Sequence, residues 1–269
     1  MGRTGASMVG LGDHTDQLGR SYDHGAELRM TISGTKAADL ARALGLRGGH
    51  HHVALVGGGG KTTLMHAIAD ALDGSTVLTC TTKMGADQHW GKPMLVDPTN
   101  ADVRAQTIND GPVLVVGKVD GQKAIGISPT RADELFALGL NVVSESDGSR
   151  RLPAKAPDSY EPVLAPNVTL VVCVIGADAL DHIIRDCCHR PLRVSAVLGC
   201  SPDDVLTPER AAELVTNVNG GRKDVPSTAR FAVCINKVNA VVAPLVQRFV
   251  NEVAERGVEV HAVEHRDGW

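Results

Sequence analysis

Four glycines, a lysine and two threonines stand together between an apolar run and a helix-like stretch of this chain. Glycine lets backbone N–H groups converge on anionic oxygens and lets a ligand approach closely. At the start of a helix, Lys61 can neutralise terminal phosphates, the hydroxyl of Thr62 can hold Mg²⁺, and Thr63 lies near the α-phosphate. The spacing predicts a phosphate-binding loop made of Gly57, Gly58, Gly59, Gly60, Lys61, Thr62 and Thr63.

This loop is shorter than the common phosphate-binding pattern. That pattern, G-x-x-x-x-G-K-[ST], needs a glycine five residues before Gly60, and Leu55 occupies the position. The remaining G-x-x-G-K-T is similar to the short loop of the Mur-type peptide ligases. The alternative is a glycine-rich turn with an incidental lysine, but its place between a strand and a helix favours a nucleotide site. We expect Lys61 to lie at an open loop rather than in the core.

Two carboxylates follow a later apolar run, in the stretch "NVVSESDGSR". A nucleotide hydrolase needs a carboxylate at the end of a neighbouring strand to position Mg²⁺ or the attacking water. Because alternate residues of a strand face the same side, Glu145 and Asp147 are expected to point together. We assign catalysis to Lys61, Glu145 and Asp147. Metal binding is assigned to Thr62 and Asp147. The alternative is an Asp-Gly turn beside a solvated glutamate.

A third candidate element, "CINKVN", ends another apolar run. It resembles the N-K-x-D element by which GTPases read guanine, but Asn239 replaces the carboxylate. An amide presents a donor where guanine requires an acceptor, so guanine selectivity is not predicted and the nucleotide stays open between ATP and GTP. Asn236 and Lys237 are predicted to pack on the base or ribose. The alternative is a polar strand end.

Apolar periodicity places these motifs on alternating strands and helices. Strands are expected over 53–56, 76–81, 112–116, 123–127, 141–144, 168–175, 231–235 and 258–263, and helices over 35–46, 61–72, 129–138, 207–215 and 244–256. The Asp120-Gly121 pair predicts a hairpin between 112–116 and 123–127. Such alternation implies right-handed βαβ units. The predicted fold is therefore a three-layer, mostly parallel α/β fold of the P-loop NTPase type.

Residues 1–30 lack periodicity and are expected to form a flexible tail, which leaves 31–269 as a single α/β domain. Within that domain, 150–165 and 177–206 are expected to be irregular and to form a lid or substrate loop. Six cysteines form no C-x-x-C pair. Cys187-Cys188-His189 resembles a soft metal site, but adjacent side chains point in different directions, so ordinary packing is favoured.

Composition limits the classes of partner. Aromatic residues make up 3% of the chain and the net charge is -4, which argues against nucleic-acid binding because phosphate backbones attract basic surfaces. No apolar run approaches the roughly 20 residues of a membrane span, and the first residues lack the apolar run of a secretion signal. We expect a cytoplasmic protein with a small-molecule or protein partner.

Several segments together resemble the YqeC-like family, described as accessory proteins of selenium-dependent molybdenum hydroxylases. They are "ALVGGGGKTT", "TCTTKM", "SESDGSRRLPAKAPDSYEPVLAP", "VVCVIGADAL", "HRP" and "INKV", in the same order, within about residues 35–240. The resemblance implies a protein that binds ATP or GTP with Mg²⁺ and assists maturation of a molybdenum hydroxylase or its pterin cofactor.

The resemblance also adds candidates for a second substrate. Lys83 is expected in the crevice at the carboxyl ends of the strands. Arg150, Lys155 and Glu161 follow the acidic strand, where a cationic pair can bind an anionic ligand; a loop salt bridge is the alternative for the last two. Three functions stay open: an NTPase or NTP-using transferase, an ATP-dependent ligase or kinase of a small metabolite, and a slow nucleotide-switched chaperone.

Overall fold

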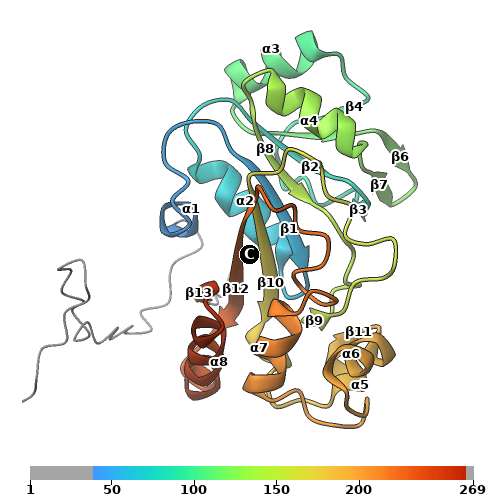
Figure 1. Cartoon of the computed structure of the whole chain (residues 1–269). Helices are drawn as coiled ribbons and strands as arrows, with labels where there is room; N and C mark the ends of the chain where they lie inside the picture. The colour runs from blue at the N-terminus through green and yellow to red at the C-terminus, as the bar shows by residue number, and fades with distance from the viewer. Residues whose placement is uncertain (1–38, 265–269) are drawn as a thin grey trace, which may run out of the picture. The chain divides into compact units, whose positions relative to one another are not determined.

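The computed structural model describes residues 39–264, so the predicted tail at 1–30 lies outside the described residues. Eight parallel strands form the main sheet in the order β13-β12-β10-β1-β8-β2-β5-β4 (Figure 1). They are β1 (His52–Gly57), β2 (Thr76–Cys80), β4 (Met94–Val96), β5 (Val113–Val116), β8 (Asn141–Glu145), β10 (Leu170–Gly176), β12 (Arg230–Val238) and β13 (Glu259–Glu264).

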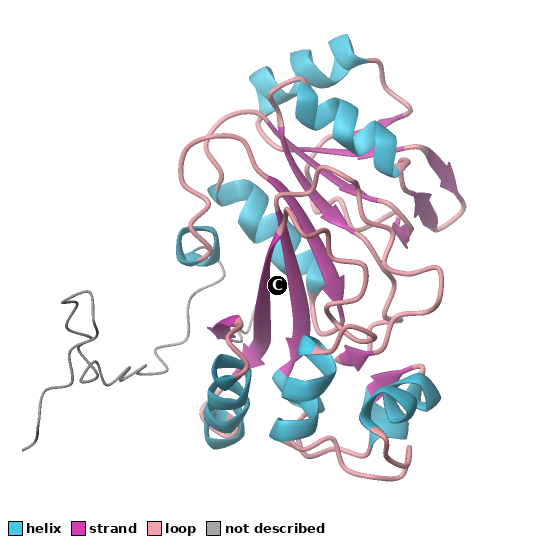
Figure 2. Ribbon diagram, in the orientation of Figure 1, coloured by secondary structure: helices cyan, strands magenta, loops and turns pink. Residues whose placement is uncertain are grey.

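Helices cover both faces of this sheet (Figure 2). They are α1 (Leu40–Ala43), α2 (Lys61–Ala71), α3 (Asn100–Asp110), α4 (Pro129–Ala137), α5 (Ile184–Cys187), α6 (Pro191–Leu198), α7 (Pro208–Thr216) and α8 (Ala243–Glu255). Leu55 of β1 packs in the cluster with α1 and α2, whereas its neighbour Val56 packs in the cluster with α7 and α8. Alternate residues of each strand are thus buried on opposite faces, which explains the continuous apolar runs. The predicted three-layer, mostly parallel α/β fold is confirmed.

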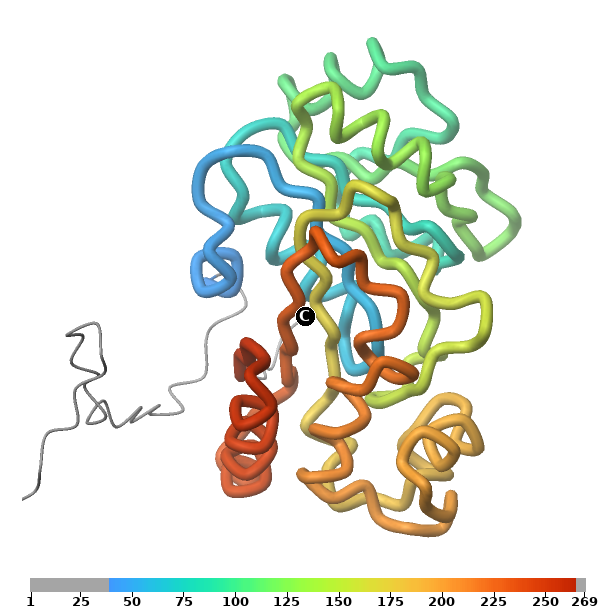
Figure 3. Tube along the Cα trace, in the orientation of Figure 1, coloured from blue at the N-terminus to red at the C-terminus, as the bar shows by residue number. Residues whose placement is uncertain are grey.

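The strand order brings two of the predicted motifs together. β1 lies between β10 and β8, and all three strands run in parallel. Leu55 pairs in register with Glu145, so the glycine loop and the acidic residues leave the same edge of the sheet. The chain after β8 then forms a long loop before it returns as β10 (Figure 3).

Local capping explains where three of the helices begin. The hydroxyls of Ser128 and Thr207 accept hydrogen bonds from the backbone N–H groups of Arg131 and Arg210, at the first turns of α4 and α7. Both helices also carry proline in the first turn, where its missing N–H and fixed φ suit a helix start. A capping box between Thr99 and Asp102 starts α3, which lies outside the predicted helices.

Two predictions about the connecting segments are wrong. β5 belongs to the main sheet, and the hairpin is formed by β6 (Lys118–Asp120) and β7 (Lys123–Ile125), with β3 (Lys83–Gly85) beside β7. The segment 177–206 is not irregular, because it contains the 3-10 turn η2 (Ala177–Ala179), α5, β11 (Cys188–His189) and α6. β11 pairs with β9 (Ala154–Lys155). None of the described helices is long and apolar enough to cross a bilayer.

Candidate functional site

The glycine loop joins β1 to α2 at the carboxyl edge of the sheet. Gly57, Gly59 and Gly60 have φ values of 94°, 74° and 112°, which L side chains rarely adopt. A Cβ on Gly59 would lie 2.1 Å from the backbone nitrogen of Gly176, and one on Gly60 would lie 2.4 Å from the amide nitrogen of Asn236. Glycine is therefore required here by both conformation and space.

The first turn of α2 presents backbone donors without partners. The first helical hydrogen bond runs from the N–H of Leu64 to the carbonyl of Gly60, at 3.1 Å. No described residue accepts from the N–H groups of residues 60–63, and Gly60 has no side chain to cap them. By contrast, Gly58 donates to Val174 and Gly59 donates to Leu152. An anion at this loop would therefore meet the helix start rather than the earlier glycines.

Lys61 is buried between two carboxylates. Its side-chain nitrogen donates to the carbonyl of Gly57 at 2.7 Å and lies 3.2 Å from Oδ1 of Asp147 and 3.5 Å from Oε1 of Glu145. The expectation of an open position is wrong, because Lys61 is only 3% exposed. Burial lowers the pKa of Lys61, but the charges of Asp147 and Glu145 outweigh burial, and the pKa is raised above its usual value.

The two carboxylates have different partners. Asp147 accepts from the N–H of Gly57 at 3.0 and 3.2 Å and contacts two ammonium groups, those of Lys61 and Lys155. Glu145 instead accepts from the hydroxyl of Thr62, at 2.7 Å. Both carboxylates reach Lys61, as their strand spacing predicts. The oxygen pair suited to a hard cation, however, consists of Thr62 and Glu145 rather than Thr62 and Asp147.

Lys155 is already held by two carboxylates and a backbone carbonyl. Its nitrogen contacts Oδ2 of Asp147 at 3.0 Å, the carbonyl of Gly148 at 2.7 Å and Oε2 of Glu161 at 2.6 Å. The Lys155–Glu161 contact is thus a salt bridge, but a buried one. Arg190 also binds Glu161, at 2.7 Å. Burial raises the pKa of Glu161, but hydrogen bonds from Arg190 and Lys155 outweigh burial and lower it below the usual value.

These ion pairs continue toward α6. Arg190 contacts Asp158 at 3.1 Å, and Asp158 contacts Arg193 at 2.5 Å. Charges of alternating sign therefore connect the glycine loop to α6, through Lys61, Asp147, Lys155, Glu161, Arg190, Asp158 and Arg193. The spacing of these residues in the sequence gives no signal for this series of ion pairs, since its members come from four separate segments.

The residues predicted to read the base have other partners. Asn236 donates to the carbonyl of Gly59 at 3.0 Å and so supports the glycine loop. Lys237 forms an ion pair with Asp178 at 2.6 Å. The side-chain oxygen of Asn239 accepts from the N–H of Val241 at 2.9 Å, in the turn before α8. These contacts match the alternative of a polar strand end for Asn239. Base contacts by Asn236 and Lys237 stay a prediction.

A second group of polar residues lies near Thr62 and is not among the residues predicted from the sequence. The amide nitrogen of Gln88 lies 3.5 Å from the Thr62 hydroxyl, and the backbone carbonyl of Gln88 lies 2.9 Å from Nε2 of His66. His66 stacks on Trp90 with ring centroids 4.4 Å apart. The four-residue spacing of Thr62 and His66 on α2 is the signal that places them on one face. Lys83 is exposed at the start of β3, and its side chain forms no ion pair or hydrogen bond with any described residue.

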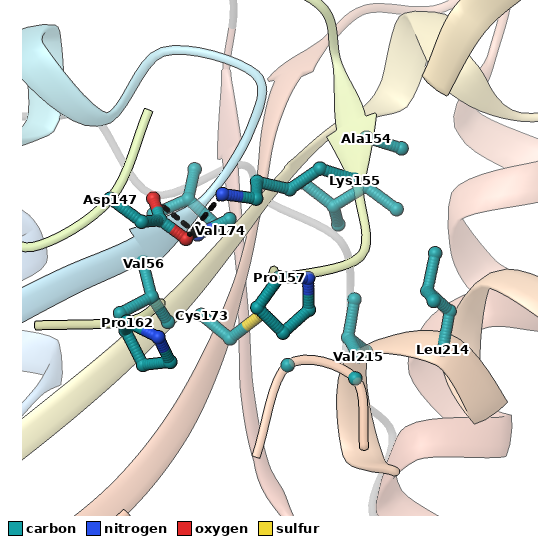
Figure 4. A pocket seen from close by; sticks show the side chains of 14 residues that line it. Val56, Asp147, Ala154, Lys155, Pro157, Pro162, Cys173, Val174, Leu214 and Val215 are labelled. Carbon is teal, nitrogen blue, oxygen red and sulfur yellow. Dashed lines mark hydrogen bonds and ion pairs between the residues drawn. The ribbon is translucent and has the colours of Figure 1, made fainter. Parts of the chain in front are cut away.

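A small apolar pocket lies behind Asp147 (Figure 4). Asp147 and Lys155 form its polar end, and Cys173, Leu214 and Val215 belong to its apolar wall. The cavity has a volume of about 20 Å³, enough for one or two waters. It is too small to hold a pterin as it stands.

The Cys187-Cys188-His189 stretch shows no metal-binding arrangement. Among the described residues, no group of three or more His, Cys, Asp or Glu side chains has the geometry of a metal site. The two thiols lie 3.5 Å apart, with Cys187 and Cys188 both buried. The short distance between the thiols shows that the expectation of side chains pointing in different directions is wrong for this pair.

Comparison with known proteins fits this site. A family model described as "YqeC protein" matches residues 53–192, which include the glycine loop, both carboxylates and the Lys155–Glu161–Arg190 cluster. The chain belongs to the YqeC family. It is also 28% identical over 225 residues to an uncharacterized protein YqeC of Escherichia coli (strain K12), an alignment that covers 78% of this chain and 88% of that protein. No solved structure matches the chain.

Proposed function

We propose that this YqeC-family chain binds a nucleoside triphosphate with Mg²⁺ at the start of α2, and that it hydrolyses the nucleotide or transfers its terminal phosphoryl group. The main support is the placement of three features at one edge of the sheet. α2 begins with N–H groups that donate to no described residue, Lys61 lies beside them, and the Thr62 hydroxyl contacts Glu145 at 2.7 Å. A helix start of this kind attracts phosphate through its N–H groups and its dipole.

We assign Mg²⁺ binding to Thr62 and Glu145. Mg²⁺ binds six oxygens at about 2.0–2.1 Å, so neighbouring ligand oxygens lie about 2.9 Å apart. The 2.7 Å separation of Thr62 Oγ1 and Glu145 Oε2 fits two adjacent ligands, with phosphate oxygens and water completing the shell. Asp147 fits less well, because nitrogen donors already surround its carboxylate. When bound, the ion would neutralise phosphate oxygens.

Asp147 is then available to orient the acceptor. A terminal phosphate that attracts Lys61 would draw it from Oδ1 of Asp147, while Lys155 and the N–H of Gly57 keep the carboxylate in place. The freed oxygen can accept the proton of a water or hydroxyl. The oxygen of that water or hydroxyl forms a bond to the terminal phosphorus. The bond from that phosphorus to the bridging oxygen breaks, and the nucleoside diphosphate leaves.

The biological role that we propose follows the family resemblance. An NTPase or transferase of this type would assist maturation of a selenium-dependent molybdenum hydroxylase or of its pterin cofactor, with ATP or GTP as the nucleotide. The chain of ion pairs from the glycine loop to α6 favours one alternative, a nucleotide-switched chaperone for an apo-metalloenzyme. In that alternative, displacement of Lys61 would change the ion pairs of Arg190 and Arg193 at the far end of the network.

Calorimetry tests the binding step, with ATP, GTP and ADP titrated at millimolar Mg²⁺ and again with a chelator. Phosphate release is then measured alone, with a small acceptor such as a pterin, and with an apo-hydroxylase. Turnover that requires the small acceptor supports a transferase, and turnover stimulated only by the protein supports the chaperone. The absence of nucleotide binding at millimolar nucleotide and Mg²⁺ would refute the proposal.

A further inference from the structure

A tight turn after β8 lies directly against the glycine loop. The carbonyl of Leu152 accepts a hydrogen bond from the N–H of Gly59 at 3.2 Å. A Cβ on Gly58 would lie 2.6 Å from the same carbonyl oxygen and 2.9 Å from the carbonyl carbon of Pro153. Arg150 and Arg151 directly precede Leu152 in the sequence, so their backbone lies next to a segment that contacts the glycine loop.

The backbone of this turn is strained. Arg150 and Arg151 have φ values of 52° and 65°, and the N–H of Leu152 donates to the carbonyl of Ser149 at 3.0 Å. Positive φ at both central residues of a hydrogen-bonded turn is the pattern of a type I′ turn, which favours Asn and Gly. Two arginines are poor choices for such a turn. Strained residues that persist in a fold cluster at functional sites, so the side chains require a further explanation.

No described residue neutralises the charges of Arg150 and Arg151. Both side chains are exposed, and neither forms an ion pair or hydrogen bond with any residue that the structure describes. The bases of the ion-pair network are balanced, since Lys61, Lys155 and the partly buried Arg190 face the three carboxylates of Glu145, Asp147 and Glu161. Among the residues 39–264, Arg150 and Arg151 thus supply two uncompensated positive charges beside a loop whose other charges are paired.

We propose that Arg150 and Arg151 bind the terminal phosphate of the nucleoside triphosphate held at the start of α2. This inference rests on the proposed function and identifies which residues distinguish a triphosphate from a diphosphate. A guanidinium presents two parallel N–H donors that match phosphate oxygens, and it stays charged at any physiological pH. Lys61 alone is insufficient because it already serves two carboxylates.

The pKa of His189 supports the direction of this charge. Burial lowers the pKa of His189 first, and the nearby positive charges, that of Arg150 among them, lower it further. His189 pairs in register with Lys155, whose ammonium contacts Asp147. Arg150 thus adds to the positive charge that Arg190 and Lys155 already place around His189.

Calorimetry of the double variant Arg150→Ala/Arg151→Ala tests the assignment. MgATP affinity should fall about 10- to 100-fold, the range for one or two hydrogen bonds to a charged group, whereas MgADP affinity should change less than about threefold. The matched control is Arg47→Ala, an exposed arginine that precedes β1 and has no partner among the described residues. It should leave both affinities unchanged. Equal losses for MgATP and MgADP, or no loss, would overturn the proposal.

Two further measurements show whether the arginines bind the phosphate of the nucleotide or that of a second substrate, and whether a negative result refutes this inference or the proposed function. Inorganic phosphate is titrated into the wild-type chain and the double variant, each saturated with MgADP. If the variant loses phosphate affinity but keeps MgATP affinity, the arginines bind a second substrate and the assignment is wrong. If the wild-type chain binds no MgATP, the proposed function itself fails. Arg150→Gly/Arg151→Gly removes the same charges with a relaxed turn, so it should reproduce the MgATP loss without unfolding.

Discussion

Replacement of Lys61 by methionine should destabilise the nucleotide-free protein as well as weaken nucleotide binding. A lysine at an open loop would be dispensable for folding, but Lys61 is 3% exposed and contacts Asp147 and Glu145 at 3.2 and 3.5 Å. Methionine keeps most of the side-chain volume and removes the charge. Two buried carboxylates would then share one fewer cation, and an uncompensated buried charge is expensive.

The expected loss follows from what each carboxylate retains. Removing one partner of a buried ion pair costs about 3–5 kcal/mol. Asp147 keeps Lys155 and the N–H of Gly57, and Glu145 keeps the Thr62 hydroxyl, so we expect the lower limit, about 3 kcal/mol. For a domain of this size, that loss lowers the melting temperature by about 6–12 °C.

Denaturant unfolding and thermal melting without nucleotide measure this loss. Lys237→Met is the matched control, because it removes the same charge from an exposed ion pair. Lys237 lies 2.6 Å from Asp178, and the two side chains are 34% and 47% exposed. Such an exposed pair contributes less than about 1 kcal/mol. If Lys61→Met is as stable as Lys237→Met, the buried network is not a source of stability and the reasoning is wrong.

Four other variants test separate parts of the structure. Glu145→Gln should weaken nucleotide binding about tenfold in the presence of Mg²⁺ and little in the presence of a chelator. Asp147→Asn should reduce turnover more than nucleotide binding. The opposite pattern in calorimetry and phosphate release would exchange the roles of the two carboxylates. Arg150→Gly/Arg151→Gly should raise the free energy of unfolding by about 1 kcal/mol through release of backbone strain, and a loss would mean the turn is unstrained. Burial lowers the pKa of His52 to about 4, although the charge of Asp133 acts in the opposite direction. The unfolded chain therefore binds the proton more readily than the folded protein does. The free energy of unfolding should fall by up to about 3 kcal/mol as the pH drops from 6.5 to 4. His52→Phe should flatten that part of the acid unfolding profile, and an unchanged profile would assign the acid sensitivity elsewhere.

The sequence predicts most of the main sheet because the local residue pattern of those strands is sufficient to identify them. β1, β8 and β10 are continuous apolar runs, and burial on both faces makes such runs necessary. The short strands β3, β4 and β9 carry no such signal, since two or three residues are too few for a period. α3 lacks an apolar stripe that could reveal it, because most of its residues are polar and only Val103 and Thr107 are buried along it.

The site divides in the same way. The N–H groups of α2 and the shared side of Glu145 and Asp147 follow from local geometry, so spacing predicts them. The partners of those groups depend on tertiary contacts. Lys155 reaches Asp147 across the turn at Arg150 and Arg151, and nothing in its spacing shows that two carboxylates and a backbone carbonyl already hold its ammonium group. A lysine near a carboxylate is equally typical of a ligand site and of an internal ion pair, and only burial separates them.

Internal neutrality of the buried network explains why the proposed nucleotide and Mg²⁺ sites depend on each other. Lys61 cannot move toward a phosphate without leaving Glu145 and Asp147 short of a cation. Lys155 continues to compensate Asp147, but Glu145 retains only the hydroxyl of Thr62. A cation bound between Thr62 and Glu145 would restore the lost charge at the carboxylate that needs it. The same buried pairing that holds Lys61 in the nucleotide-free protein would thus disfavour a metal-free nucleotide and favour the nucleotide–Mg²⁺ complex.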